Sequence, residues 1–215
     1  MFKNKKMVIC ISLIVIILYI ILIKFVDVKA IGPENTEVGF ATINGFFHNI
    51  LPYNELFYKV SKYLGYLSFL LILFYAAIGA YQLIKYKKIE KVDKKIIMLG
   101  FFYIIVLITY FFFEKVKINY RPVILDEGLE ASFPSSHTML AICVCLSAII
   151  MNKYIKFKKK PRLLFNICLY VLMALIVLSR FLSGVHWFTD IIGGILISLF
   201  LVYIFYISIS VTKKR

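Results

Sequence analysis

The sequence contains a series of apolar segments that are each long enough to cross a lipid bilayer. Each is close to the roughly 20 residues that a helix needs to span a hydrocarbon core, and the six segments cover residues 7–25, 64–84, 96–113, 133–151, 163–179 and 187–210. A backbone in lipid must satisfy its polar groups internally, which favours helices. The sequence therefore predicts an all-α membrane bundle of six transmembrane helices, forming a single domain over residues 1–215.

Composition agrees with this fold class. Apolar residues make up 62% of the chain, which excludes an ordinary soluble domain and a disordered chain. Residues 1–63 are expected to form an N-terminal span and an interfacial loop outside the membrane, and residues 64–210 to hold the other five spans. The lysines before the first span resemble a signal peptide, with a possible cleavage site at residues 28–30. The apolar segment is longer than a usual signal core, which favours a retained anchor, with cleavage as the alternative.

Basic residues gather in alternate connections between the predicted spans. Cytoplasmic loops carry such an excess of lysine and arginine, so both termini are predicted to be cytoplasmic, with residues 114–133 and 179–190 on the outer side. The net charge of +15 indicates contact with anionic membrane lipids. Nucleic-acid binding is not expected, because no recognisable fold signal accompanies the basic clusters. These clusters are Lys3, Lys5, Lys6, then Lys85, Lys87, Lys88, Lys91, Lys94, Lys95, then Lys153, Lys156, Lys158, Lys159, Lys160, Arg162, and finally Lys213, Lys214, Arg215.

The four cysteines predict neither a disulfide nor a metal site. Cys10, Cys143, Cys145 and Cys168 all fall inside predicted spans, where cysteine behaves as a small apolar residue. The sequence also lacks a cluster of acidic residues or of Cys and His with ligand spacing. It therefore predicts no metal and no cofactor.

Residues 179–190, SRFLSGVHWFTD, place ionisable groups between two apolar spans. Such groups at a membrane are costly, and by default they indicate function. His186 and Asp190 are four apart and share a helix face, so Asp190 is expected to accept a hydrogen bond from the His186 ring. A histidine held in this way is a nucleophile or base with a fixed tautomer. Arg180 adds a planar cation that suits a phosphoryl oxyanion.

A second polar group opens the fourth predicted span with Pro-Ser-Ser-His at residues 134–137. Proline favours the first helical turn, and the free N–H groups of a helix start bind anions. Ser135 is expected to add a hydroxyl donor, although a plain capping motif is the alternative. Together with Arg121, Arg180 and a lysine, these residues predict a phosphoryl-transfer site. In this site His186 attacks phosphorus and His137 protonates the leaving oxygen.

These motifs resemble those of the type 2 phosphatidic acid phosphatase (PAP2) superfamily. Residues 179–190 resemble its third signature, and Pro-Ser-Ser-His resembles its second, with Ser136 where glycine is usual. The Arg-Pro pair at 121–122 resembles the end of its first signature, whose lysine lies seven positions before Arg121. That position holds Glu114 here, so the candidate lysines are Lys115, which we favour, and Lys117. The resemblance covers about residues 96–210, the expected catalytic core.

The resemblance also implies roles for individual residues. It implies that His186 becomes a phosphohistidine that water hydrolyses, and that His137 is the general acid. The implied phosphate-binding residues are Lys115, Arg121, Ser135, Ser136 and Arg180.

The expected activity is a metal-independent phosphatase that acts on a lipid phosphate or diphosphate at the outer leaflet. Undecaprenyl diphosphate is the first expected substrate, and phosphatidylglycerophosphate or phosphatidate is the second. Transfer of the phosphoryl group to another lipid is a further alternative. A non-enzymatic six-span anion transporter is the remote one, because transport sites usually lie near the bilayer midplane, whereas these polar residues gather at one face.

Overall fold

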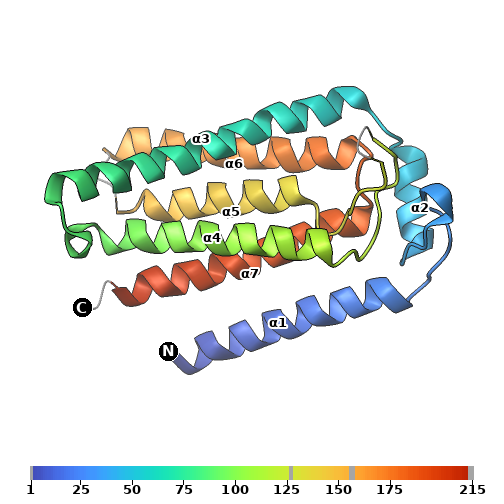
Figure 1. Ribbon diagram of the computed structural model, residues 1–215, viewed down its shortest axis with the longest axis horizontal. Coiled ribbons are helices and arrows are strands. Elements are labelled where there is room, and N and C mark those ends of the chain that lie inside the picture. Colours follow the sequence, from blue (N-terminus) through green and yellow to red (C-terminus); the bar gives the residue numbers. More distant parts are fainter. Residues whose placement is uncertain (1, 126–127, 155–157, 213–215) are drawn as a thin grey trace.

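The computed structural model of this protein describes residues 2–125, 128–154 and 158–212 (Figure 1). Lys156, Lys213, Lys214 and Arg215, which contribute to the charge pattern, lie outside the described residues. The fold is all-α, as predicted. Its elements are α1 (Phe2–Phe25), η1 (Pro33–Asn35), α2 (Ala41–Ile50), α3 (Glu55–Tyr86), η2 (Ile89–Lys91), α4 (Lys94–Lys115), α5 (Ser136–Met151), α6 (Lys159–Leu182) and α7 (Phe188–Thr212).

Five of the described helices, α1, α3, α4, α6 and α7, are long and apolar enough to cross a membrane. The expected span at residues 133–151 corresponds to α5, which has only 16 residues. A helix of that length extends about 24 Å, less than the roughly 30 Å of a hydrocarbon core. The six predicted segments are thus all helical, but α5 is too short to count as a span by length alone.

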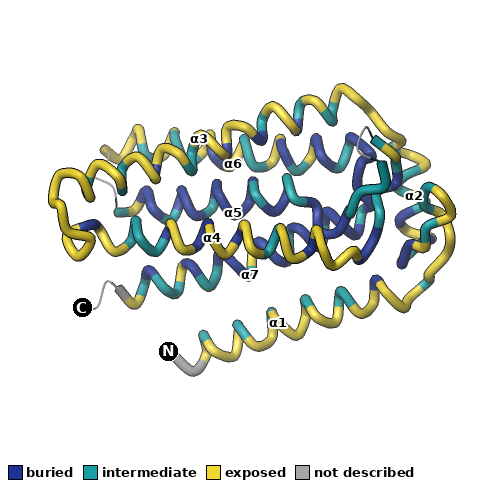
Figure 2. The backbone as a smooth tube through the Cα atoms, viewed as in Figure 1, coloured by how far each residue is buried: buried dark blue, intermediate teal, exposed yellow. Residues whose placement is uncertain are grey.

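The short helix α5 forms the centre of the bundle. Figure 1 shows it between α3, α4, α6 and α7, and in Figure 2 it is the most continuously buried helix. Met139, Cys143, Val144 and Ala148 are at most 1% exposed, because neighbouring helices cover α5 on all sides. Lipid does not have to cover this helix, so it can be shorter than the others.

The outer helices bury one side and expose apolar side chains on the other. Leu70 on α3, Ile108 on α4 and Leu164 on α6 are all more than half exposed. Such a surface is stable only against hydrocarbon, because large exposed apolar areas are rare on soluble proteins. Of the four cysteines, Cys143 and Cys145 are buried, whereas Cys10 and Cys168 lie on this exposed surface.

Helix α3 begins nine residues earlier than the apolar segment that predicts it. Asn54 caps its start by accepting a hydrogen bond from the Phe57 backbone N–H at 3.2 Å, as asparagine commonly does at a helix N-terminus. The residues from Glu55 to Tyr63, assigned to a loop by hydropathy, therefore form the first turns of α3. This correction matters because those turns lie beside the polar residues described below.

Helix α2 and the start of α7 are held together by polar contacts. The Asn44 side chain donates to Thr189 Oγ1 at 3.0 Å and accepts from the Thr189 backbone N–H at 3.1 Å. From α1, the Tyr19 hydroxyl donates to the Thr189 carbonyl at 2.9 Å. These bonds fix α7 at the end of the bundle where α2 lies, to the right in Figure 1. We call this the site end.

Two connections complete the site end. Between α4 and α5 the chain folds back on itself, with a bridge between Tyr120 and Ala131 and a bond from the Ser132 N–H to the Asn119 carbonyl at 2.9 Å. The α6–α7 turn contains Gly184 at φ +64°, where an added Cβ would lie 2.7 Å from the Leu51 carbonyl oxygen. Only glycine allows both this conformation and this approach.

Candidate active site

The site end brings together polar residues of α3, α4, α5, α6 and two connections around two small cavities. The first, of about 90 Å³, is lined by residues that include Glu114, Arg121, Glu130, Ser136 and His186. The second, of about 200 Å³, shares Arg121 and Glu130 with the first and adds Tyr58, Lys62, Tyr66, His137 and Arg180. The structure thus gathers five of the residues predicted from sequence: Arg121, Ser136, His137, Arg180 and His186.

His186 and Asp190 are not directly hydrogen-bonded to each other, contrary to the expectation from their spacing. Ser132 lies between them: its Oγ is 3.0 Å from His186 Nδ1 and donates to Asp190 Oδ2 at 2.5 Å. A hydroxyl has one proton, which here goes to the carboxylate, so Oγ accepts from Nδ1–H. The spacing failed as a guide because His186 lies in the turn before α7 and is not on the same helix as Asp190.

This arrangement leaves the other ring nitrogen free to react. His186 Nε2 is buried and has no hydrogen-bond partner among the described residues. With the Nδ1 proton held by Ser132, Nε2 carries the lone pair. His186 is one of the residues that line the first cavity.

Asp190 is fully buried, and its carboxylate is well satisfied. Besides Ser132, it accepts from Asn119 Nδ2 at 3.2 Å and from the Trp187 backbone N–H at 3.0 Å. It also lies in the first turn of α7, where the helix dipole stabilises negative charge. These contacts hold Asp190 as a fixed anchor for the Ser132 hydroxyl.

The surroundings of His186 favour its neutral form. Burial lowers the pKa of this imidazole well below its usual value, and the positive charges of Arg180 and Arg121 lower it further. A hydrogen bond to the Ser132 backbone raises the pKa, but by less. A neutral imidazole is what a nucleophile requires, so the ring is ready to react without first losing a proton.

Arg180 is a buried cation without an ionic partner. It is 1% exposed, its Nη1 donates to Ser61 Oγ at 3.2 Å, and its guanidinium carbon lies 5.1 Å from the centre of the Tyr58 ring. Its Nε has no hydrogen-bond partner, and it makes no salt bridge to a carboxylate in the described part of the chain. Burial of an uncompensated charge is costly, which makes this position a strong attractor for an anion.

Arg121 is less buried and already paired. One terminal nitrogen lies 2.7 Å from Glu130 Oε2, and its Nε has no partner among the described residues. Its position is fixed by a backbone bond from the Arg121 N–H to the Glu130 carbonyl at 3.1 Å. Arg121 can therefore offer Nε to an anion while Glu130 holds the rest of the guanidinium.

His137 and Ser136 form the first turn of α5, as the helix-start motif predicts. Gly65 of α3 packs against the His137 ring so closely that an added Cβ would lie 3.2 Å from its Cδ2. The Ser135 hydroxyl, in contrast, donates to Thr138 Oγ1 at 3.0 Å. Ser135 is the N-cap residue of α5 but makes no side-chain capping hydrogen bond, and it is not among the described residues that line either polar cavity.

Neither predicted lysine reaches the cavities in this structure. Lys115 is the last residue of α4 and is exposed. The Lys117 ammonium lies 5.3 Å from the Tyr120 ring centre. Neither belongs to the described residues that line the two polar cavities.

Several residues of the site carry no motif signal. Asn119, Glu130 and Ser132 come from the α4–α5 connection, and a further group comes from the first turns of α3, a segment that hydropathy assigned to a loop. This group comprises Tyr58, Ser61, Lys62 and Gly65. Within the described residues, no three His, Cys, Asp or Glu side chains are grouped so as to hold a metal ion.

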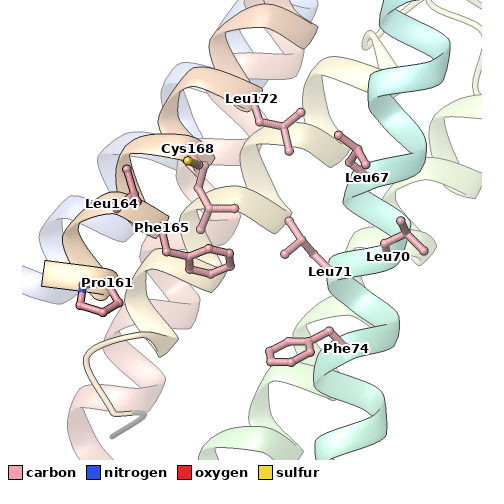
Figure 3. A pocket seen from close by; sticks show the side chains of 10 residues that line it. Leu67, Leu70, Leu71, Phe74, Pro161, Leu164, Phe165, Cys168 and Leu172 are labelled. Atoms are coloured by element: carbon pink, nitrogen blue, oxygen red, sulfur yellow. The ribbon is translucent and has the colours of Figure 1, made fainter. Parts of the chain in front are cut away.

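One apolar cavity adjoins the polar ones, and a second lies on the exposed side of the bundle. One, of about 230 Å³, lies between α3, α4 and α5 and reaches Ser136 and His137. The larger, of about 720 Å³, lies between α3 and α6 and is lined by apolar side chains such as Leu71, Phe165 and Leu172 (Figure 3). The larger cavity contains none of the polar site residues, so the chemistry is confined to the site end.

Known proteins share part of this sequence and its fold. Phosphatidylglycerophosphatase B of Bacillus subtilis is 33% identical over 92 residues, which is 42% of this chain and 44% of that protein, so the match spans less than half of the relative. The crystal structure of a transmembrane PAP2-type phosphatidylglycerolphosphate phosphatase from Bacillus subtilis shares the fold, with a TM-score of 0.53 and 22% identity over 77% of this chain and 83% of that one. The model of the PAP2 superfamily matches residues 46–214, and this chain belongs to that superfamily.

Proposed function

We propose that this protein is a membrane lipid phosphate phosphatase that works through a phosphohistidine at His186. The observation that carries the proposal is the state of that ring. Its Nδ1 proton is held by Ser132 and, through it, by Asp190, while Nε2 is buried and has no hydrogen-bond partner among the described residues. Membership of the PAP2 superfamily supports the same reading.

The proposed reaction has two steps. In the first, His186 Nε2 forms a bond to phosphorus as the bond from phosphorus to the lipid oxygen breaks, and protonated His137 gives its proton to that oxygen. In the second, water attacks phosphorus and His137 takes its proton. The nitrogen–phosphorus bond then breaks, releasing inorganic phosphate and the free imidazole.

The arginines supply the positive charge that this reaction needs. Arg180 and the free Nε of Arg121 are placed to bind non-bridging phosphoryl oxygens, and the start of α5 at Ser136 can add a backbone N–H. Because these charges are fixed before substrate arrives, they stabilise the transition state without reorganisation. We expect no requirement for a divalent metal.

We propose phosphatidylglycerophosphate as the substrate. The reason is that both related proteins described above are named for activity on this lipid, which favours the second substrate expected from sequence over undecaprenyl diphosphate. The apolar cavity that reaches Ser136 and His137 has the chemistry to hold part of a lipid chain beside the leaving oxygen. Following the distribution of lysines, we place the site end on the outer side of the membrane.

The test is phosphate release by the purified protein in detergent, with phosphatidylglycerophosphate, phosphatidate, undecaprenyl diphosphate and a free aryl phosphate as substrates. We expect the highest kcat/KM for phosphatidylglycerophosphate, and activity in the presence of EDTA. His186→Gln should abolish release. His48→Gln is the control, because the centre of the His48 ring lies 5.4 Å from that of Trp187, edge to face, and His48 Nδ1 has no hydrogen-bond partner among the described residues.

Each outcome has a distinct meaning. Preference for undecaprenyl diphosphate would restore the first substrate expected from sequence, and transfer of phosphate to a second lipid would indicate a phosphotransferase. Full activity of His186→Gln would refute the mechanism. Release of phosphate from none of the four substrates would refute the phosphatase itself and leave the anion transporter as the alternative.

A further inference from the structure

One face of α3 forms a wall of the candidate site. Tyr58, Ser61, Lys62 and Gly65 follow the spacing i, i+3, i+4, i+7, which places them on one side of a helix. Three of them touch named site residues: Tyr58 and Ser61 contact Arg180, and Gly65 packs against His137. The fourth, Lys62, lines the same cavity as Arg121, His137 and Arg180.

Lys62 places a positive charge beside carboxylates that line the candidate site. The position from which the PAP2 resemblance expects a lysine is Glu114, a carboxylate that lines the first polar cavity. A second carboxylate, Glu130, forms an ion pair with one terminal nitrogen of the Arg121 guanidinium. A doubly charged phosphate group would therefore be repelled by two carboxylates as well as attracted by two arginines. A third cation would offset the repulsion between the phosphate and the carboxylates.

The surroundings of Lys62 leave its ammonium free for this role. No carboxylate among the described residues lies within salt-bridge distance of it, whereas its neighbour Lys59 is bound to Glu55 at 2.7 Å. The charge of Lys62 also acts on the His137 ring, together with those of Arg180 and Arg121. Its backbone lies in the first turns of α3, so its flexible side chain can reach the cavity from the membrane surface.

We propose that Lys62 is the phosphate-binding lysine of this site, supplied by α3 in place of the lysine that the first signature would place at the end of α4. This inference rests on the proposed phosphatase function. It replaces Lys115 and Lys117 in that role, and it gives the first turns of α3 a part in substrate binding.

The test compares Lys62→Ala, Lys62→Arg and the control Lys59→Ala in the full-length protein. The control removes an exposed lysine of the same helix that is outside the cavity. The measurements are hydrolysis of an aryl phosphate, which needs no knowledge of the natural lipid, and calorimetric binding of orthovanadate. Thermal unfolding in detergent checks that each variant is folded.

We expect Lys62→Ala to weaken orthovanadate binding about tenfold and to lower kcat/KM about 10- to 100-fold, at or below the loss from removing one oxyanion donor. Lys62→Arg should retain most of the orthovanadate affinity and most of kcat/KM. Lys59→Ala should match the wild type in both measurements. A Lys62→Ala variant that is folded and within twofold of Lys59→Ala in both measurements overturns the proposal. So does a larger loss in Lys115→Ala or Lys117→Ala.

The two proposals fail in different ways. A wild-type protein that hydrolyses nothing refutes the phosphatase, while orthovanadate binding still reports whether Lys62 contributes to an anion site. An active wild type with an unaffected Lys62→Ala refutes only the role of Lys62.

Discussion

The Ser132 hydroxyl offers the sharpest test of how the candidate site works. Among the residues that the structure describes, it alone connects His186 Nδ1 to the Asp190 carboxylate, at 3.0 and 2.5 Å. Ser132→Ala removes this link and leaves both flanking side chains in place. Asp190 would keep its bonds from Asn119 and the Trp187 backbone, so the fold around α7 should survive, while the His186 ring loses what fixes its tautomer.

The size of the effect follows from the bond that is lost. A hydrogen bond to a charged group contributes about 1.5–3 kcal/mol, and about 1.4 kcal/mol corresponds to a factor of ten in rate. If the bond acts mainly on the reactive form of His186, kcat should fall about 10- to 150-fold. The KM should change little, because Ser132 is not among the described residues that line the polar cavities.

The assay is the rate of phosphoenzyme formation in rapid-quench experiments, together with the pH profile of kcat/KM. Ser132→Ala removes the hydroxyl that accepts the Nδ1 proton. Because a hydrogen bond to the charged form of a group favours that form, its loss should disfavour the imidazolium, and the acidic limb of the profile should move to lower pH. A purely structural role would not move the limb. Ser198→Ala is the control, since it removes a buried hydroxyl that donates to the Met139 and Gly194 carbonyls, away from the Ser132 relay. Unchanged phosphoenzyme formation in Ser132→Ala would refute the relay.

Three further predictions concern protonation and topology. Because burial and the two arginines hold the pKa of His186 well below its usual value, the wild type should stay active as the pH falls below about 6.5, the ordinary histidine pKa; a loss of kcat/KM centred at or above that pH would contradict this. His137→Ala should keep more relative activity on an aryl phosphate with a good leaving group than on a lipid phosphate, and radiolabelled phosphate should still be trapped on His186. Equal losses on both substrates, or label on another residue, would show that the roles are wrongly assigned. In a cysteine-free background, an impermeant thiol reagent on intact cells should label a cysteine at Ile124 but not one at Lys88, and the reverse pattern would invert the proposed topology.

Local sequence properties were enough to define the fold class and the heart of the site. Apolar runs and their lengths predicted every long helix, because the cost of burying a polar backbone in lipid depends on neighbouring residues alone. The polar residues Arg180, His186 and Asp190 stood out for the same reason, as ionisable groups between apolar segments. The positions of the polar residues at the ends of the predicted spans also predicted that the three polar segments would lie at one end of the bundle.

The contacts that give these residues their chemistry were decided by packing. Ser132 reaches His186 across 54 positions, and Arg180 reaches Ser61 across 119. No periodicity extends over such separations, and the chain has to close around α5 before these side chains meet. The sequence therefore predicted a direct contact between His186 and Asp190 that the tertiary structure replaced with a serine. It also could not place the first turns of α3, where hydropathy is low but helical capping and packing against Arg180 and His137 extend the helix into the site.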